Sequence, residues 1–284
     1  MEKEIEFYCG LTPYLNCKDH LVSGESYEVM FCDQYEMLVT SPVPVDLGHY
    51  YQDEAYISHT DSKKTLFDKV YQTIKKISTK RKFNLINSFQ TEKRILDIGA
   101  GTGDFLSFFK SKGWKVFGVE PNEKARTLSA QKEVFLQDKI SVYNQQQFDV
   151  ITMWHVLEHV PNLSEYIRTL ERLLTEKGIL IVAVPNFKSF DASHYKEFWA
   201  AYDVPRHLWH FSQTGIDQLF KEVDMKVIEK HPLKFDSYYV SLLSEQNKTG
   251  KKNIARAFLN GWKSNRKARR TSEYSSVIYV LKKK

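Results

Sequence analysis

The chain has 284 residues, 42% of them hydrophobic, and a formal net charge of +6, a composition that can bury a core and excludes wholesale disorder. It has no run of the roughly 18–20 apolar residues that a membrane span needs, and its acidic N-terminus lacks a signal-peptide stretch, so we expect a protein that is neither integral to a membrane nor secreted. Three cysteines are too few for a disulfide framework and favour a reducing cytoplasm.

Residues 1–90 are predicted to form an N-terminal appendage that ends in a helix. The helix is indicated by an apolar stripe made of Leu66, Val70, Tyr71, Ile74 and Ile77. The cysteine region before it resembles a degraded metal ribbon: Tyr35 stands where a second cysteine would complete a C-x-x-C pair with Cys32, and Cys9 and Cys17 are eight residues apart. Three scattered thiols make a poor zinc site, so we expect no zinc.

Residues 91–284 alternate between short apolar strands and helices. Strands are predicted at residues 93–98, 115–120, 148–154, 179–184, 225–228 and 276–281. Helices are predicted at residues 104–110, from Asn162 to Gly178, and after Ser212 or Thr214. The run at 179–184 is almost entirely apolar, which is typical of a parallel strand covered on both faces. The succession predicts a doubly wound α/β sheet with helices on both faces.

The strongest motif lies where the first of these strands ends, in the segment Ile95-Leu96-Asp97-Ile98-Gly99-Ala100-Gly101-Thr102-Gly103. Glycine lets the backbone turn sharply and lets a ligand approach the main chain, and the helix start that follows presents free N–H groups. Glu120 ends the next strand, where a carboxylate can accept both hydroxyls of a ribose. Asp104 stands where a dinucleotide motif has its third glycine, and Asp97 would repel a pyrophosphate but suits an ammonium. The pattern therefore favours S-adenosylmethionine over NAD.

From about residue 95 the chain resembles the class I SAM-dependent methyltransferases, in the bacterial branch related to quinone-biosynthesis O-methyltransferases. Three blocks carry the resemblance: the glycine segment, Val119-Glu120-Pro121, and residues 148–160. It implies a seven-stranded sheet whose last strand, residues 276–281, is antiparallel. It also implies that Asp97 and the glycines hold the methionine part of the cofactor and that Glu120 holds the ribose. We accordingly assign cofactor binding to Asp97, Gly99, Ala100, Gly101, Gly103, Glu120, Pro121 and Trp154.

A polar cluster, His155, Glu158 and His159, follows the strand at residues 148–154. Some related quinone O-methyltransferases carry Glu-x-x-Glu-His here and are thought to bind a divalent ion with it. An imidazole at the first position weakens a site for a hard cation, so we assign no metal ligand. The alternative is that Glu158 and His159 only cap and brace a helix.

A second cluster, residues 199–212, follows the strand at 179–184, on the ligand-bearing edge of such a sheet. Similar Pro-Arg-His-Leu segments recur in related methyltransferases and lie over the acceptor pocket. We predict substrate contacts for Tyr202, Asp203 and Arg206, with Arg206 pairing either with Asp203 or with an anionic substrate. Because imidazole titrates near working pH, the candidate catalytic groups are His155, His159 and His207. The alternative is a loop whose polar groups satisfy one another.

Nine lysines and arginines lie between Lys248 and Arg270 without an intervening acid, in a basic insertion predicted at residues 245–272. Such a segment favours contact with a phosphate, a polyanion or a lipid head group, although it can equally be a solvated surface helix.

The function expected is methyl transfer from S-adenosylmethionine to a small-molecule or carrier-linked acceptor, at oxygen, in the cytoplasm or peripherally at a membrane surface. One alternative is an NAD-dependent oxidoreductase or sugar-modifying enzyme. Another is a binding module that contacts RNA or an anionic partner through the basic insertion. The signature of amino-group methylation on nucleic-acid bases is missing after residue 154, and no cysteine lies in the catalytic half, so a nucleic-acid substrate is not expected.

Overall fold

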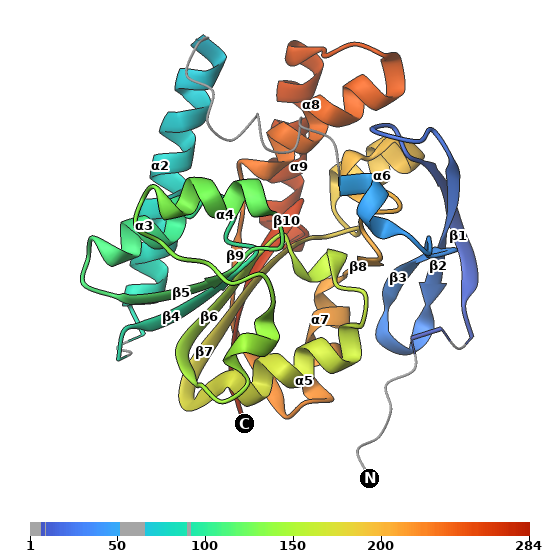
Figure 1. Cartoon of the computed structure of the whole chain (residues 1–284). Helices are drawn as coiled ribbons and strands as arrows, with labels where there is room; N and C mark the ends of the chain where they lie inside the picture. Colours follow the sequence, from blue (N-terminus) through green and yellow to red (C-terminus); the bar gives the residue numbers. More distant parts are fainter. Residues whose placement is uncertain (1–6, 9, 52–65, 90–91) are drawn as a thin grey trace.

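The computed structural model describes residues 7–8, 10–51, 66–89 and 92–284, with side chains of the first long helix from residue 73 onward (Figure 1). Two β-sheets organise it. The smaller sheet is antiparallel, with strand order β1-β2-β3-β8. Its strands are β1 (Thr12–Lys18), β2 (Ser26–Cys32), β3 (Met37–Ser41) and β8 (Trp209–His210). A segment from late in the chain therefore completes a sheet built by the first 41 residues.

The larger sheet has the strand order β5-β4-β6-β7-β10-β9. Its strands are β4 (Arg94–Ile98), β5 (Lys115–Val119), β6 (Phe148–Trp154), β7 (Leu174–Pro185), β9 (Met225–Pro232) and β10 (Ser276–Lys283). The pairs among β5, β4, β6 and β7 are parallel, and β10 is antiparallel to both β7 and β9. Beyond β5, a single parallel bridge between Val119 and Gln137 takes the place of a seventh strand. The predicted doubly wound sheet with an antiparallel last strand is confirmed.

Helices cover both faces of this sheet (Figure 1). They are α2 (Leu66–Asn87), α3 (Asp104–Lys110), α4 (Glu123–Ala130), α5 (Leu163–Leu173), α6 (Phe190–Tyr195), α7 (Gln213–Lys221), α8 (Asp236–Thr249) and α9 (Ile254–Thr271). Two of their starts follow the capping chemistry expected from the sequence. The side chain of Asn162 accepts from the N–H of Glu165, and the side chain of Ser212 accepts from the N–H of Gly215.

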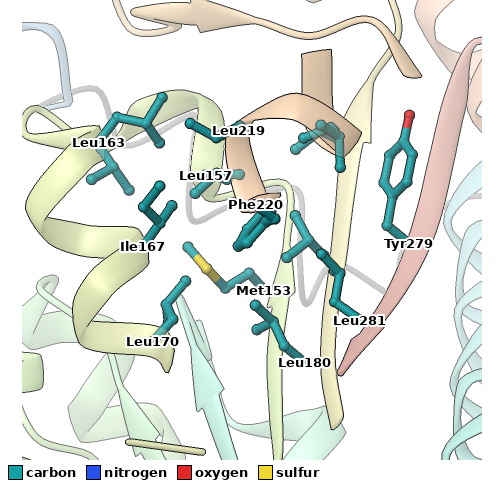
Figure 2. Close-up of a cluster of buried hydrophobic side chains, with 14 of the residues drawn as sticks. Met153, Leu157, Leu163, Ile167, Leu170, Leu180, Leu219, Phe220, Tyr279 and Leu281 are labelled. Carbon is teal, nitrogen blue, oxygen red and sulfur yellow. The ribbon is translucent and has the colours of Figure 1, made fainter. Parts of the chain in front are cut away.

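The two faces of the sheet have separate apolar cores. In one core, leucine and isoleucine side chains of α5 and α7 pack against alternate residues of β6, β7 and β10, as Figure 2 shows for Met153, Leu180 and Leu281. In the other, α2 and α3 pack on the intervening residues of the same strands, so that Ile86 and Phe109 meet Val150 and Ile181. Burial on both faces explains why these strands read as continuous apolar runs.

One predicted helix boundary is wrong. The helix that begins after Asn162 ends at Leu173 rather than at Gly178, because Leu174 is fully buried and starts β7 by pairing with Phe148. The apolar spacing that includes Leu174 fits a helix and a strand equally well, and pairing with a neighbouring strand decides between them.

Two of the three cysteines lie in the smaller sheet. Cys17 and Cys32 are buried thiols that form no disulfide, and burial raises the pKa of Cys17 to about 12. Cys9 lies outside the described residues. Among the described helices, none is long and apolar enough to cross a bilayer.

Candidate active site

The glycine segment forms a tight turn between β4 and α3. Gly99, Gly101 and Gly103 have φ angles of +71°, +53° and +75°, a region that L side chains rarely adopt. A Cβ at Gly99 would lie 2.4 Å from the side chain of Val156, whereas a Cβ at Gly101 would have no described atom within 4 Å. The main chain at Gly101 therefore faces open space, as a backbone cradle for a ligand does.

Glu120 lies at the edge of this cradle, directly after β5. One of its carboxylate oxygens accepts the N–H of Gly101 at 2.8 Å, and the other accepts the N–H of Asn122 at 2.9 Å. Because a carboxylate offers about four acceptor positions, two backbone bonds leave room for two further donors. Glu120 therefore has the capacity to hold two adjacent hydroxyls while it remains fixed by the main chain.

Asp97, two residues before the first glycine, is 2% exposed and accepts a 2.6 Å hydrogen bond from the hydroxyl of Thr152. Burial raises the pKa of Asp97 to about 7, although Thr152 and the ammonium of Lys82 act in the opposite direction. Lys82 comes from α2, and its Nζ lies 3.7 Å from the centre of the Trp154 ring. Burial lowers the pKa of Lys82 to about 8. An acid and a base thus meet here, which suits the ammonium and carboxylate of an amino acid.

His155 lies immediately after β6, with a positive φ of +57°. Its Nε2 is 3.0 Å from a carboxylate oxygen of Asp236 on α8, and its Nδ1 is 3.5 Å from an oxygen of Glu158. Burial works against a charged imidazole, but the two carboxylates outweigh it and raise the pKa of His155 to about 10. At neutral pH His155 is therefore a cation that connects the end of β6 to the start of α8.

Glu158 is fully buried, and no described residue donates a hydrogen bond to either of its oxygens. Burial alone would raise the pKa of its carboxyl, yet His155 and the neighbouring imidazoles lower it to about 2. The rings of His159 and His207 lie next to it, 4.5 Å apart between centres. One ligand atom from each of Glu158, His159 and His207 lies within 4.8 Å of the others, so these three side chains could hold a divalent cation.

Both imidazoles of this cluster have a defined orientation. The Nδ1 of His159 is 3.0 Å from the carbonyl oxygen of Arg206, and the Nδ1 of His207 is 2.9 Å from that of Ala201. Because a carbonyl only accepts, each Nδ1 carries a proton. Burial and the neighbouring His207 lower the pKa of His159 to about 4, so His159 is neutral at physiological pH.

The predicted substrate residues lie in the same loop but are engaged by the protein. Arg206 is 3% exposed and donates to both oxygens of Asp203 and, at 2.9 Å, to Asp19 of the β1–β2 turn. The pairing with Asp203 is one of the two expected for it. Tyr202 is 3% exposed and packs edge-on against Trp199 and His210. A role in substrate binding stays a prediction for these three residues.

The smaller sheet holds the loop of residues 199–212 in place beside the histidine cluster. The hydroxyl of Thr40 on β3 donates to the carbonyl of His207 at 2.6 Å, and the N–H of Leu208 donates to the carbonyl of Glu158 at 2.8 Å. The hydroxyl of Tyr51 lies 3.0 Å from Nδ1 of His159. These contacts bring the segment of His155, Glu158 and His159 together with the loop of residues 199–212. Sequence reasoning missed the roles of five residues at this site, because each contacts it from a distant segment. They are Asp19, Thr40, Tyr51, Lys82 and Asp236.

Comparisons with known proteins identify the family. A family model described as a methyltransferase domain matches residues 64–230, more than half of the chain. The chain belongs to this methyltransferase family. A ubiquinone biosynthesis O-methyltransferase of Histophilus somni is 32% identical over 111 residues, which cover 34% of this chain and 46% of the relative. Its counterpart in Rhodopseudomonas palustris (strain TIE-1) is 27% identical over 146 residues, which cover 49% of this chain and 55% of the relative. The chain thus spans about half the length of the curated relatives it matches.

Solved methyltransferase structures share the fold. The magnesium protoporphyrin IX methyltransferase (ChlM) from Synechocystis PCC 6803, solved with bound SAH, superposes with a TM-score of 0.56 at 12% identity, covering 83% of this chain and 97% of that one. A putative sarcosine dimethylglycine methyltransferase from Galdieria sulphuraria gives a TM-score of 0.52 at 12% identity, covering 76% and 88%. At this identity the likeness concerns the fold alone, and it agrees with the predicted resemblance to class I methyltransferases, which is confirmed.

Proposed function

We propose that this methyltransferase moves the methyl group of S-adenosylmethionine to a hydroxyl of a small-molecule or carrier-linked acceptor. The observation that carries the proposal is the open main chain at Gly101 between two carboxylates, Glu120 and Asp97. One carboxylate suits the hydroxyls of a ribose and the other suits an ammonium, which are the two ends of this cofactor. When bound, S-adenosylmethionine supplies an electrophilic methyl group.

Cofactor binding is also proposed for the remaining assigned residues, which belong to the cradle or adjoin it. Ala100 and Gly103 belong to the turn itself, and Pro121 follows Glu120. The indole of Trp154 faces Lys82, and its N–H has no hydrogen-bond partner among the described residues. Lys82 would lie beside the carboxylate of a bound amino acid while Asp97 holds the ammonium.

NAD fits this turn poorly. Asp104 takes the place of the third glycine of a dinucleotide motif, and its carboxylate is held by Lys75 at 2.5 Å and by Lys132 at 2.6 Å. A side chain in place of the third glycine removes the close approach that a dinucleotide motif needs, and the carboxylate of Asp97 disfavours a pyrophosphate.

Proton removal from the acceptor is assigned to His207. His155 is a cation and cannot accept a proton, and the lowered pKa of His159 makes it a weak base. The Nδ1 of His207 is engaged by the carbonyl of Ala201, so Nε2 is the atom that would accept a proton, and it lies 3.9 Å from an oxygen of Asp203, with the anionic Glu158 beside the ring. Both carboxylates would stabilise the imidazolium that forms when Nε2 takes the hydroxyl proton.

The test is methyl transfer with S-adenosylmethionine labelled on its methyl group, using aqueous and lipid metabolite extracts as the acceptor source. A labelled product that gains one methyl group at oxygen is expected. His207→Gln should bind S-adenosylhomocysteine normally but transfer methyl about 10²–10⁴-fold more slowly. His231→Gln, which alters a half-buried histidine paired with Glu229, is the matched control and should keep full activity. Binding of NAD but not of S-adenosylhomocysteine would overturn the proposal.

A further inference from the structure

The basic insertion, residues 245–272, contains the end of α8 and all of α9, and in Figure 1 these two helices stand beyond the sheet at the top of the molecule. α9 packs on its surroundings through small or polar residues. The buried ones are Ala257, Asn260, Gly261, Ser264 and Ala268. A Cβ at Gly261 would lie 2.7 Å from the ring of Tyr238 on α8, so glycine permits the close approach of the two helices. Among the large apolar residues of α9, Phe258 stacks on Tyr238 of α8 with 5.3 Å between ring centres, yet it stays largely exposed.

Those large residues face solvent. Ile254, Phe258 and Trp262 follow one another at four-residue spacing, so they form one stripe along the helix, and they are 70%, 63% and 44% exposed. Leu259 beside the stripe is 47% exposed. Exposed apolar residues are ordinary when scattered, but a contiguous stripe on a helix indicates a surface that meets another apolar phase.

The segment that carries the stripe also carries nine cations. All nine are exposed, and they are Lys248, Lys251, Lys252, Arg256, Lys263, Arg266, Lys267, Arg269 and Arg270. None of them forms an ion pair with a carboxylate in the parts of the chain that the structure describes. The guanidinium of Arg266 lies over the ring of Trp262, at 5.3 Å from its centre. Because these positive charges are not neutralised by carboxylates of the described residues, they favour binding of an anionic partner.

We propose that α8 and α9 dock on an anionic lipid bilayer, with the stripe of α9 at the boundary between head groups and acyl chains. An apolar stripe bordered by lysine and arginine is the pattern of helices that lie in a membrane interface. A single-stranded nucleic acid would use the flat faces of the aromatic rings but would leave Ile254 and Leu259 without a role. The aliphatic members of the stripe therefore favour lipid.

The docking surface adjoins the active site. Asp236, which binds His155, is the first residue of α8, and the exposed side chains of Phe235 and Tyr239 lie on either side of it in sequence. Further along α8, the hydroxyl of Ser244 accepts the N–H of Ala200. Docking would thus bring the loop over the histidine cluster near the membrane. This step rests on the proposed function, and it assigns an acceptor that carries a hydrophobic tail and a hydroxyl head.

The experiment is flotation of the full chain with vesicles of phosphatidylcholine alone and of phosphatidylcholine mixed with phosphatidylglycerol, over a salt series. Binding to the mixed vesicles is expected, weakening with salt. Since each cation near such a surface is worth about fivefold in affinity, K263E/R266E/R270E, which removes three cations and adds three repelling carboxylates, should bind at least about 100-fold more weakly. K177E/K221E/K226E changes the net charge equally but alters residues near the amino ends of β7 and β9, and it should bind like the wild type.

A second variant tests the apolar stripe separately from charge. F258S/W262S keeps every cation and should lose vesicle binding, whereas the fluorescence of Trp262 in the wild type should shift to shorter wavelength on insertion. Equal binding to both vesicle types, no binding to either, or tighter binding to bulk RNA than to mixed vesicles at the same salt would overturn the proposal. Titration with S-adenosylhomocysteine in the absence of lipid is measured on every protein, so a failure of cofactor binding is distinguished from a failure of docking.

Discussion

Replacing Asp97 with asparagine tests the cost and the use of a buried carboxylate in the cofactor cradle. Burial raises the pKa of Asp97 from 3.8 to about 7, against the effects of Thr152 and Lys82. Because one pKa unit corresponds to about 1.4 kcal/mol, ionisation of Asp97 costs the folded protein roughly 4 kcal/mol. The amide introduced by Asp97→Asn would keep an oxygen that accepts from Thr152 but would carry no charge. The variant should therefore be more stable than the wild type at neutral pH and bind the cofactor less tightly.

Proton binding to Asp97 sets the sign of the effect on stability. Between about pH 4 and pH 7 the folded wild type keeps a proton on Asp97 that the unfolded chain has released, so its stability falls as the pH rises through this window. Asparagine removes this dependence. The free energy of unfolding of Asp97→Asn relative to wild type should thus rise from near zero at pH 4 to as much as about 4 kcal/mol above pH 7. Loss of Asp97 also removes a carboxylate that raises the pKa of Lys82, and this partly offsets the gain.

The assay is urea unfolding of both proteins at several pH values, together with calorimetric titration of S-adenosylhomocysteine. Asp138→Asn, which removes an exposed carboxylate near the same edge of the sheet, is the control for the loss of a charge. A stability difference that stays constant from pH 4 to pH 8, or undiminished cofactor affinity in Asp97→Asn, would refute the reasoning.

Three further predictions concern the cradle, the loop and the imidazole cluster. Gly101→Ala should lower the free energy of unfolding by about 1–2 kcal/mol, because of its positive φ, and should also lower the affinity for S-adenosylhomocysteine. Gly99→Ala should lower the free energy of unfolding by more, because the new Cβ would clash with the side chain of Val156. Equal losses of the two variants in urea unfolding would contradict this. Arg206→Met should destabilise by about 3–5 kcal/mol, since it leaves the buried carboxylate of Asp19 without its cation and with hydrogen bonds from neutral donors of residues 21–23. An unchanged unfolding midpoint would be the contrary result. Treatment with a chelator should leave methyl transfer intact, since protonated His155 already balances the buried glutamate; activity lost and restored by added metal would show a metal site.

The local periodicity of the sequence was sufficient for most of the larger sheet. Strand β6 and helix α3 have the predicted bounds, because each combines an apolar pattern with a clear start or stop such as Gly103. The glycine turn and Glu120 were also predictable, since they adjoin in sequence the strand ends that place them. Patterns of this kind depend on neighbours within a few residues, which a single sequence displays.

Contacts between distant segments were not predictable in the same way. β8 has two residues, too few to carry a strand pattern, and it exists because Val39 and Leu38 pair with Trp209 and His210. The ion pair of His155 with Asp236 and that of Arg206 with Asp19 likewise join elements whose proximity depends on the complete fold. The sequence therefore indicated the chemical groups of the site, while their partners and protonation states required the three-dimensional structure.

The most direct measurement is a crystal structure of the protein with S-adenosylhomocysteine. We expect its ribose hydroxyls to contact Glu120, its main-chain neighbour to be Gly101, and its ammonium to lie beside Asp97. Density for the nucleoside at any other place, or an empty cradle at saturating ligand, would contradict this assignment.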